Sequence, residues 1–134
     1  MTPTDVAHRL LSKARQDEVA LAKLGDDPAV ADETVGFHAQ QAVEKALKAV
    51  LLSLDGRMRR THDLERLFRT MVQHGGALPC TVEDMADLTP FAVAYRYGDL
   101  ADDIEEPLDR TRIRKLVADL LAWAESKLTD HPRT

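Results

Sequence analysis

The chain has 134 residues, of which 44% are hydrophobic and 31% charged, so we expect one folded domain with its own core rather than a disordered chain. Its formal net charge of -5 argues against unspecific coating of nucleic acid, although a local basic patch stays compatible with phosphate binding. The single cysteine, Cys80, excludes an intrachain disulfide and a zinc site built from clustered cysteines.

The chain carries neither of the two hydrophobic signals that direct a protein to a membrane. No apolar run approaches the roughly 20 residues of a membrane span. The first residues also lack the charged start and apolar core of a signal peptide. We therefore expect a cytoplasmic protein.

Apolar residues recur at helical spacing along almost the whole chain, and no alternating strand pattern stands between hairpin turns. The predicted first helix runs from Thr4 to Leu24, and Gly25 is expected to end it in a left-handed cap. Asp27 followed by Pro28 is typical of an N-cap and a first helical position. The second predicted helix therefore starts there and ends near Leu54.

The second predicted helix has the strongest apolar stripe, flanked by alanines that would let a neighbouring helix approach closely. We expect it to be the central helix. On its opposite side, Glu44 and Lys48 stand four residues apart in the order that favours an ion pair, which is typical of a solvated face. Gln40 instead falls on the apolar side, where it needs a buried hydrogen-bond partner.

The second half of the chain predicts three more helices. Thr61 is expected to cap the first of these, and the run His74-Gly75-Gly76 to end it. Thr81 and Asp84 resemble a capping box that opens the next helix, which would continue through Tyr95 with a kink at Pro90 and end at Gly98. Pro107 is expected to begin the last helix.

Short connectors favour antiparallel neighbours, so the fold class is all-α, an up-and-down antiparallel bundle of about five helices. We expect it to span residues 1–128, with a frayed tail over residues 129–134.

Two polar segments point to chemistry. Three arginines crowd the stretch from Arg57 to Arg60, just before a predicted helix N-terminus, where guanidinium groups and free N–H groups would suit a phosphate. The alternative is a solvated basic loop. The stretch YRYGD places Arg96, Tyr97 and Asp99 at a predicted helix end, where Arg96 would neutralise phosphate or pair with an acid.

The doublet His62-Asp63 also fits a metal-dependent phosphohydrolase of the His-Asp type, with His38 and Asp99 as further ligands. This pattern is weak, because one doublet with freely chosen partners is easily found. No nucleotide-binding glycine loop and no serine nucleophile motif is present, so the residues by themselves name no reaction.

Three strings, FHAQQAVEKALKAVL, THDL and AYRYGD, together resemble the HEPN family, the "higher eukaryotes and prokaryotes nucleotide-binding" domain. They occur in family order, and the resemblance covers nearly the whole chain. Tyr95 and Gly98 depart from the family pattern, which has a small residue and a proline there.

The resemblance implies a helical bundle related to the helical domain of aminoglycoside nucleotidyltransferases. It also implies a homodimer that acts with a separately encoded minimal nucleotidyltransferase, in a toxin–antitoxin or stress-related role, without a cofactor or metal of its own. By the same resemblance, the nucleotide or substrate site comprises twelve residues: His38, Gln41, Glu44, Lys45, Lys48, Arg60, Thr61, His62, Asp63, Arg96, Tyr97 and Asp99. We expect Arg96 and His62 to lie near Gln41 and Lys45 in one groove.

Many HEPN relatives are metal-independent ribonucleases with an Arg and a His four to six residues apart. Two pairs, Arg57 with His62 and Arg69 with His74, have this spacing. With three permitted spacings about one such pair arises by chance, so the spacing alone does not choose between an active nuclease and a binding module.

Overall fold

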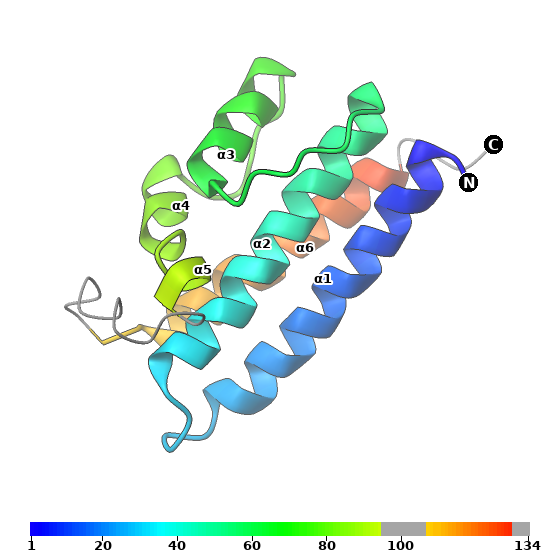
Figure 1. Cartoon of the computed structure of the whole chain (residues 1–134). Helices are drawn as coiled ribbons and strands as arrows, with labels where there is room; N and C mark the ends of the chain where they lie inside the picture. Colours follow the sequence, from blue (N-terminus) through cyan, green and yellow to red (C-terminus); the bar gives the residue numbers. More distant parts are fainter. Residues whose placement is uncertain (95–106, 130–134) are drawn as a thin grey trace.

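The computed structural model describes residues 1–94 and 107–129, and within these ranges all regular structure is α-helical (Figure 1). The helices are α1 (Pro3–Gly25), α2 (Asp32–Asp55), α3 (Leu64–Gln73), α4 (Val82–Leu88), α5 (Phe91–Ala94) and α6 (Arg110–Thr129). The predicted all-α bundle is confirmed. The expected frayed tail lies mostly outside the described residues.

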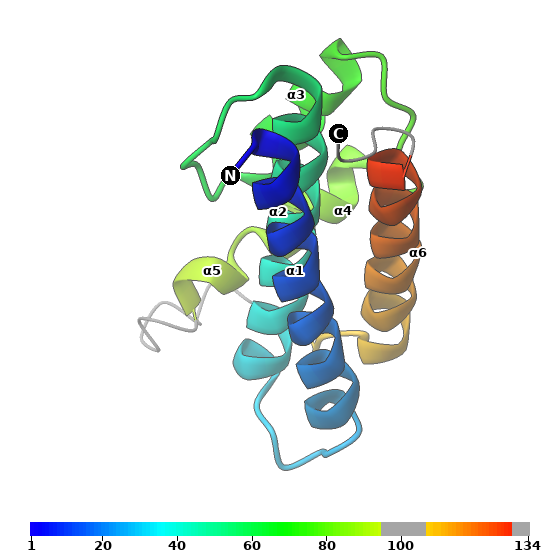
Figure 2. The same ribbon diagram turned by 90° about the vertical axis from the view of Figure 1, so that its right-hand side faces the viewer.

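Helix α2 is the central helix, as predicted from its apolar stripe. It contacts α1, α3, α4, α5 and α6, and its valines, leucines and alanines are almost all fully buried. The long helices α1, α2 and α6 each contact the other two and form a three-helix bundle, and the short helices α3 to α5 lie on one side of α2 (Figures 1 and 2). Alanines in the middle of α2 allow this close approach on several sides.

The connector 56–63 runs back along α2 before α3 begins (Figure 1). Helix α3 therefore runs in the same direction as α2, and these two neighbours are not antiparallel as predicted. Gly56 begins this turn with a φ of 72°, in the left-handed region that glycine occupies at low cost. Two side-chain contacts fix the position of α3 along α2: His62 contacts Glu44 before α3 begins, and His74 contacts Asp55 where α3 ends.

The predicted caps at the end of α1, at the start of α2 and at the start of α3 are wrong. Helix α1 ends at an αR residue, Asp26, and Gly25 has no positive φ. Helix α2 begins at Asp32, because Asp27 starts a turn, with its carboxylate accepting from the N–H of Ala29. Helix α3 begins after Asp63, whose carboxylate accepts from the N–H of Arg66, whereas Thr61 accepts from the N–H of Asp63 outside the helix.

The late start of α2 has a tertiary cause. The guanidinium of Arg110 donates to the carbonyl oxygens of Asp27 and Val30 at 2.9 and 2.5 Å, and to the carboxylate of Asp32. These carbonyls therefore bond to a side chain from α6 instead of opening a helix. Sequence spacing near residue 27 gives no sign of a partner eighty residues away.

The predicted start of α4 and the predicted end of α3 are confirmed, whereas two later predictions need correction. Thr81 and Asp84 form a reciprocal capping box at the start of α4. His74 and Gly75 end α3, with a φ of 83° at Gly75. Pro90 lies between α4 and α5 and interrupts the helix, so the kink that was expected there is a full break between two short helices. The predicted start of the last helix is three residues early, because Asp109 caps it by accepting from the N–H of Arg112.

Candidate functional site

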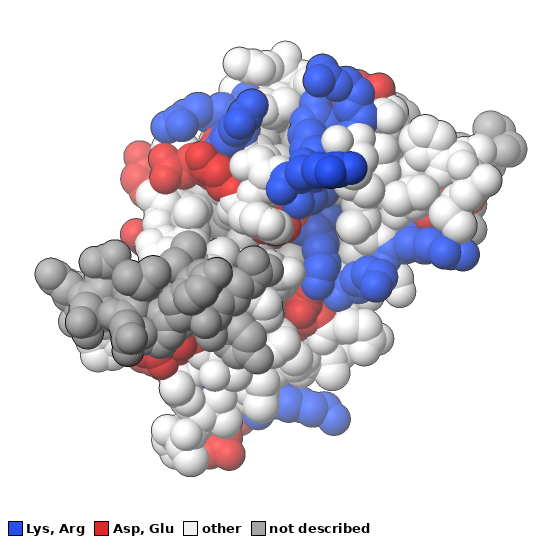
Figure 3. Space-filling model, in the orientation of Figure 1, with Lys and Arg blue, Asp and Glu red and all other residues white. Residues whose placement is uncertain are grey.

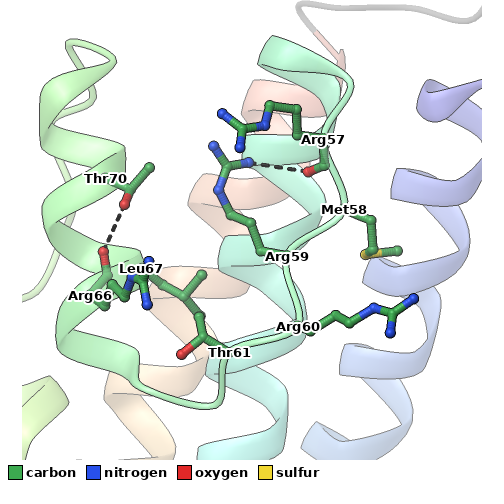
Figure 4. Close-up of a pocket in the computed structure, with 8 residues that line it drawn as sticks. All are labelled: Arg57, Met58, Arg59, Arg60, Thr61, Arg66, Leu67 and Thr70. Carbon is green, nitrogen blue, oxygen red and sulfur yellow. Dashed lines mark hydrogen bonds between the residues drawn. The ribbon is translucent and has the colours of Figure 1, made fainter.

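A hollow of about 410 Å³ lies between the connector 56–63 and helix α3. We call it the arginine hollow; its lining residues are Arg57, Met58, Arg59, Arg60, Thr61, Arg66, Leu67 and Thr70 (Figure 4). The side chains of Arg57 and Arg59 extend from the connector into the space facing α3, whereas Met58 and Arg60 extend toward α1. The hollow exists because the connector runs back alongside α3 rather than away from it.

The charges around the arginine hollow are unusual for this protein. Most arginines in the described part of the chain pair with a carboxylate: Arg15, Arg59, Arg69, Arg110, Arg112 and Arg114. Within residues 1–94 and 107–129, the guanidinium groups of Arg57, Arg60 and Arg66 have no such partner, and only Arg9 on α1 shares this condition. Basic side chains accordingly gather over the connector side of the molecule (Figure 3). The hollow collects positive charge that no carboxylate in the described ranges neutralises.

Asp55, the last residue of α2, fixes one end of the connector. Its carboxylate accepts from Nη1 and Nη2 of Arg59 at 3.1 and 2.5 Å and from the N–H of Arg57 at 3.0 Å. Nε2 of His74 lies 3.3 Å from the same carboxylate. Arg59, outweighing partial burial and helped by the Arg57 N–H and the charge of His74, holds the pKa of Asp55 at about 2, against an ordinary 3.8.

Glu44 fixes the other end of the connector from inside α2. Its carboxylate accepts from Gln40 and from Lys48, each at 2.9 Å, and lies 3.0 Å from Nδ1 of His62. Burial alone would raise the pKa of Glu44, but the hydrogen bonds from Lys48, Gln40 and His62 outweigh it and leave the pKa below its ordinary value. The Glu44–Lys48 pair is present as predicted, yet it is buried rather than solvated, with side chains 6% and 9% exposed.

A second polar cluster ties α1 to α2. Asp17 of α1 lies 3.1 Å from Nδ1 of His38 through one carboxylate oxygen and 2.5 Å from Nζ of Lys45 through the other. Gln41 lies between the clusters and donates to Gln40 at 2.7 Å. The polar residues of the FHAQQAVEKALKAVL helix therefore divide between two carboxylates, Asp17 and Glu44.

His62 and His74, the histidines of the two Arg–His pairs, differ in the partners of their ring nitrogens. Because a carboxylate only accepts, Nδ1 of His62 carries the proton that faces Glu44, and Nε2 has no partner among the described residues. The His62 side chain is 55% exposed. In His74, Nδ1 donates to the carbonyl of Thr70 at 2.9 Å and Nε2 faces Asp55, so both ring nitrogens are engaged. Arg69 pairs with Glu65 instead of joining His74.

The expected groove is only partly described. His62 lies at α2 beside Glu44, whereas Lys45 turns to Asp17 on α1, so these two side chains belong to different clusters. Arg96, Tyr97 and Asp99 lie outside the described residues. Within the described ranges no group of three or more His, Cys, Asp or Glu side chains stands close enough to hold a metal ion, and His38 and His62 are each held by a separate carboxylate.

Three residues of the hollow and the polar clusters are not among the predicted site residues: Asp17, Asp55 and Arg66. The signal for Asp55 would have been its place directly before Gly56 and a run of arginines, since a carboxylate there meets whichever arginine folds back over the helix end.

The fold and the hollow define a helical-bundle protein with a local cationic site on an acidic chain. The chain matches the family model described as HEPN domain over residues 7–127, and it therefore belongs to the HEPN domain family. Membership places it among proteins of nucleotide-binding or ribonuclease type. No curated protein and no solved structure gives a significant match. Among the described residues, no helix is both long and apolar enough to cross a membrane.

Proposed function

We propose that the protein is a HEPN-type nucleotide-binding and interaction subunit that acts in the cytoplasm with a separately encoded minimal nucleotidyltransferase. The observation that carries the binding part is the arginine hollow. There the guanidinium groups of Arg57 and Arg66, which pair with no described carboxylate, stand with Arg59 around one space. At about 410 Å³ the hollow has the size of a small-ligand site.

The hollow favours phosphate for an electrostatic reason. A guanidinium group presents planar forks of N–H donors that match phosphate oxygens, and it keeps its charge at all physiological pH values. The whole chain carries a net charge of -5, so unspecific attraction of anions is weak and the local arginines must supply the affinity. We therefore infer that the phosphate group of a nucleotide binds in the hollow.

Calorimetric titration with ATP tests this proposal. The double substitution Arg57→Ala with Arg66→Ala should weaken ATP binding at least tenfold, since each charged hydrogen bond contributes about 1.5–3 kcal/mol. Arg9→Ala is the matched control, because Arg9 is likewise unpaired among the described residues but lies on α1, outside the hollow. Equal affinities in the double variant and the control would refute the phosphate site.

The partner is inferred from family membership and needs a separate experiment. Co-expression with a minimal nucleotidyltransferase encoded beside this chain should yield a stable complex through tandem affinity purification. Sedimentation of the protein alone should show a homodimer. A toxin–antitoxin or stress-related role predicts that expression of the chain slows growth and that the partner reverses the effect. Failure to co-purify would remove the partnership while leaving the phosphate site untouched.

A second candidate, a metal-independent ribonuclease, is favoured by the geometry of His62. Glu44 holds Nδ1, so Nε2 of the neutral ring has a lone pair available to accept a proton from a 2′-hydroxyl. Arg57, five residues earlier, lines the adjoining hollow and would stabilise the phosphate charge. This arrangement supports His62 as the nuclease candidate and His74 as a structural residue.

Incubation of the protein with labelled single-stranded RNA in EDTA tests this second candidate. Activity that is lost in His62→Ala and kept in His74→Ala would establish the ribonuclease. Absence of cleavage by the wild-type protein would leave the binding subunit as the function.

A further inference from the structure

Among the residues that the structure describes, the hydrogen bonds of Arg59 leave one edge of its guanidinium group unused. A guanidinium has five N–H donors in a fixed plane. Nη1 of Arg59 donates to Oδ1 of Asp55 and to the carbonyl of Arg57, each at 3.1 Å, and Nη2 donates to Oδ2 of Asp55 at 2.5 Å. These bonds use both hydrogens of Nη1 and the inner hydrogen of Nη2. What remains is the side edge, formed by Nε–H and the outer N–H of Nη2.

This free edge faces the arginine hollow. Arg59 lines the hollow, and Figure 4 shows its guanidinium standing between the connector and α3, with the bond to Arg57 on the side away from α3. The side edge of a guanidinium presents two parallel donors, the arrangement that binds two oxygens of one phosphate. An arginine that first seems neutralised by its ion pair therefore keeps a complete fork for a ligand.

We propose that the Nε–Nη2 edge of Arg59 is a bidentate subsite for one phosphate group, and that Asp55 is its positioning residue. This inference rests on the proposed phosphate site and specifies the atom pair at its centre. Asp55 does not touch the ligand. It holds the guanidinium plane from the opposite edge, so that the fork is oriented before binding and less side-chain entropy is lost when the phosphate arrives.

The surroundings of Asp55 equip it for this role. Its carboxylate is fixed from three directions, by Arg59, by the N–H of Arg57 and by His74 at the end of α3. The side chains of Arg59 and Asp55 are only 17% and 20% exposed, so solvent competes weakly for their pairing. Arg57 and Arg66 contribute positive charge that no described carboxylate neutralises. The oriented guanidinium of Arg59 determines from which side the phosphate is bound.

ATP and inorganic tripolyphosphate are suitable probes, since the second lacks a base and reports on phosphate binding alone. Arg59→Lys keeps the charge but has no fork, and we expect it to weaken binding of both probes by about tenfold, nearly as much as Arg59→Ala. Asp55→Asn should weaken binding roughly three- to tenfold, although it makes the protein less negative. Asp26→Asn is the control for the change in charge, because Asp26 also pairs with an arginine, Arg114, and lies outside the hollow.

A double-mutant cycle separates positioning from a general loss of stability. If Asp55 acts through Arg59, Asp55→Asn should change the affinity little in an Arg59→Ala background, whereas a structural defect would add to the loss. Tighter binding by Asp55→Asn than by Asp26→Asn would overturn the inference and make Asp55 an internal competitor of phosphate. The proposed function fails separately, if Arg57→Ala with Arg66→Ala binds both probes as well as the wild type does.

Discussion

The carboxylate of Glu44 lies 3.0 Å from Nδ1 of His62 and, in the interior of the central helix, also accepts from Gln40 and Lys48. One buried carboxylate thus satisfies two other buried side chains of α2 and anchors the connector to that helix. A network of this kind is stable only while every member keeps its partner, because an unpaired buried charge is costly.

The first prediction concerns this network. Glu44→Ala should lower the free energy of unfolding by about 3–5 kcal/mol, because Lys48 would remain buried without its partner. Asp119→Ala, which breaks an exposed pair with Lys115 at the same spacing, should cost about 0.5 kcal/mol. Urea unfolding of both variants measures the difference. A similar small loss of unfolding free energy in both variants would mean that water reaches the Glu44–Lys48 pair.

The second prediction concerns acid. The pKa of Asp55 is about 2 in the folded protein and 3.8 ordinarily, and the pKa of Glu44 is also lowered from 4.5. Groups with lowered pKa values contribute stability that is complete above the ordinary pKa and disappears as the pH falls through the folded value. Stability should therefore decline below about pH 4.5 and continue to decline toward about pH 2.

Urea midpoints measured at neutral pH and at about pH 3 give the acid-dependent loss. Asp55→Asn should show a smaller loss than the wild type, since it has no carboxylate to protonate at that position. Asp26→Asn serves as control for the charge change. An equal acid-dependent loss in Asp55→Asn and wild type would contradict the assignment.

The third prediction concerns helix packing. A Cβ added to Gly36 in α2 would lie 2.2 Å from the ring of Phe91, so Gly36→Ala should force α5 away and cost about 1–3 kcal/mol. Gly25→Ala is the matched control: its Cβ would meet no atom closer than 3.8 Å, and removal of a helical glycine should stabilise by about 0.5–1 kcal/mol. Thermal unfolding should shift in opposite directions for the two variants.

The fourth prediction concerns the thiol. Burial, aided by the charge of Asp84, raises the pKa of Cys80 to about 11 from an ordinary 9.0. Since the thiolate is the reacting form, labelling by a disulfide reagent near pH 8 should be roughly 100-fold slower in the folded protein than in urea. Rapid labelling under native conditions would show that the segment around Cys80 opens readily.

Local signals in the sequence were sufficient for the central helix and for some of the helix ends. The apolar stripe of Val43, Leu47 and Val50 identifies the central helix because burial follows helical spacing. Gly75 and the pair Thr81 with Asp84 mark helix ends, since left-handed backbone and capping boxes depend on neighbours only a few residues away. The need of Gln40 for a buried partner was also predictable from its place on the apolar side, and Glu44 meets it.

The sequence by itself determined the all-α class, the central helix and the family, because helical periodicity and signature strings are local properties of the chain. The tertiary structure decided the site. It turned the connector back beside α3, bound Arg110 to the loop before α2, and brought His74 at the end of α3 to Asp55 at the end of α2. Pairing between charged side chains far apart in sequence depends on which helices pack together, and no spacing rule contains that information.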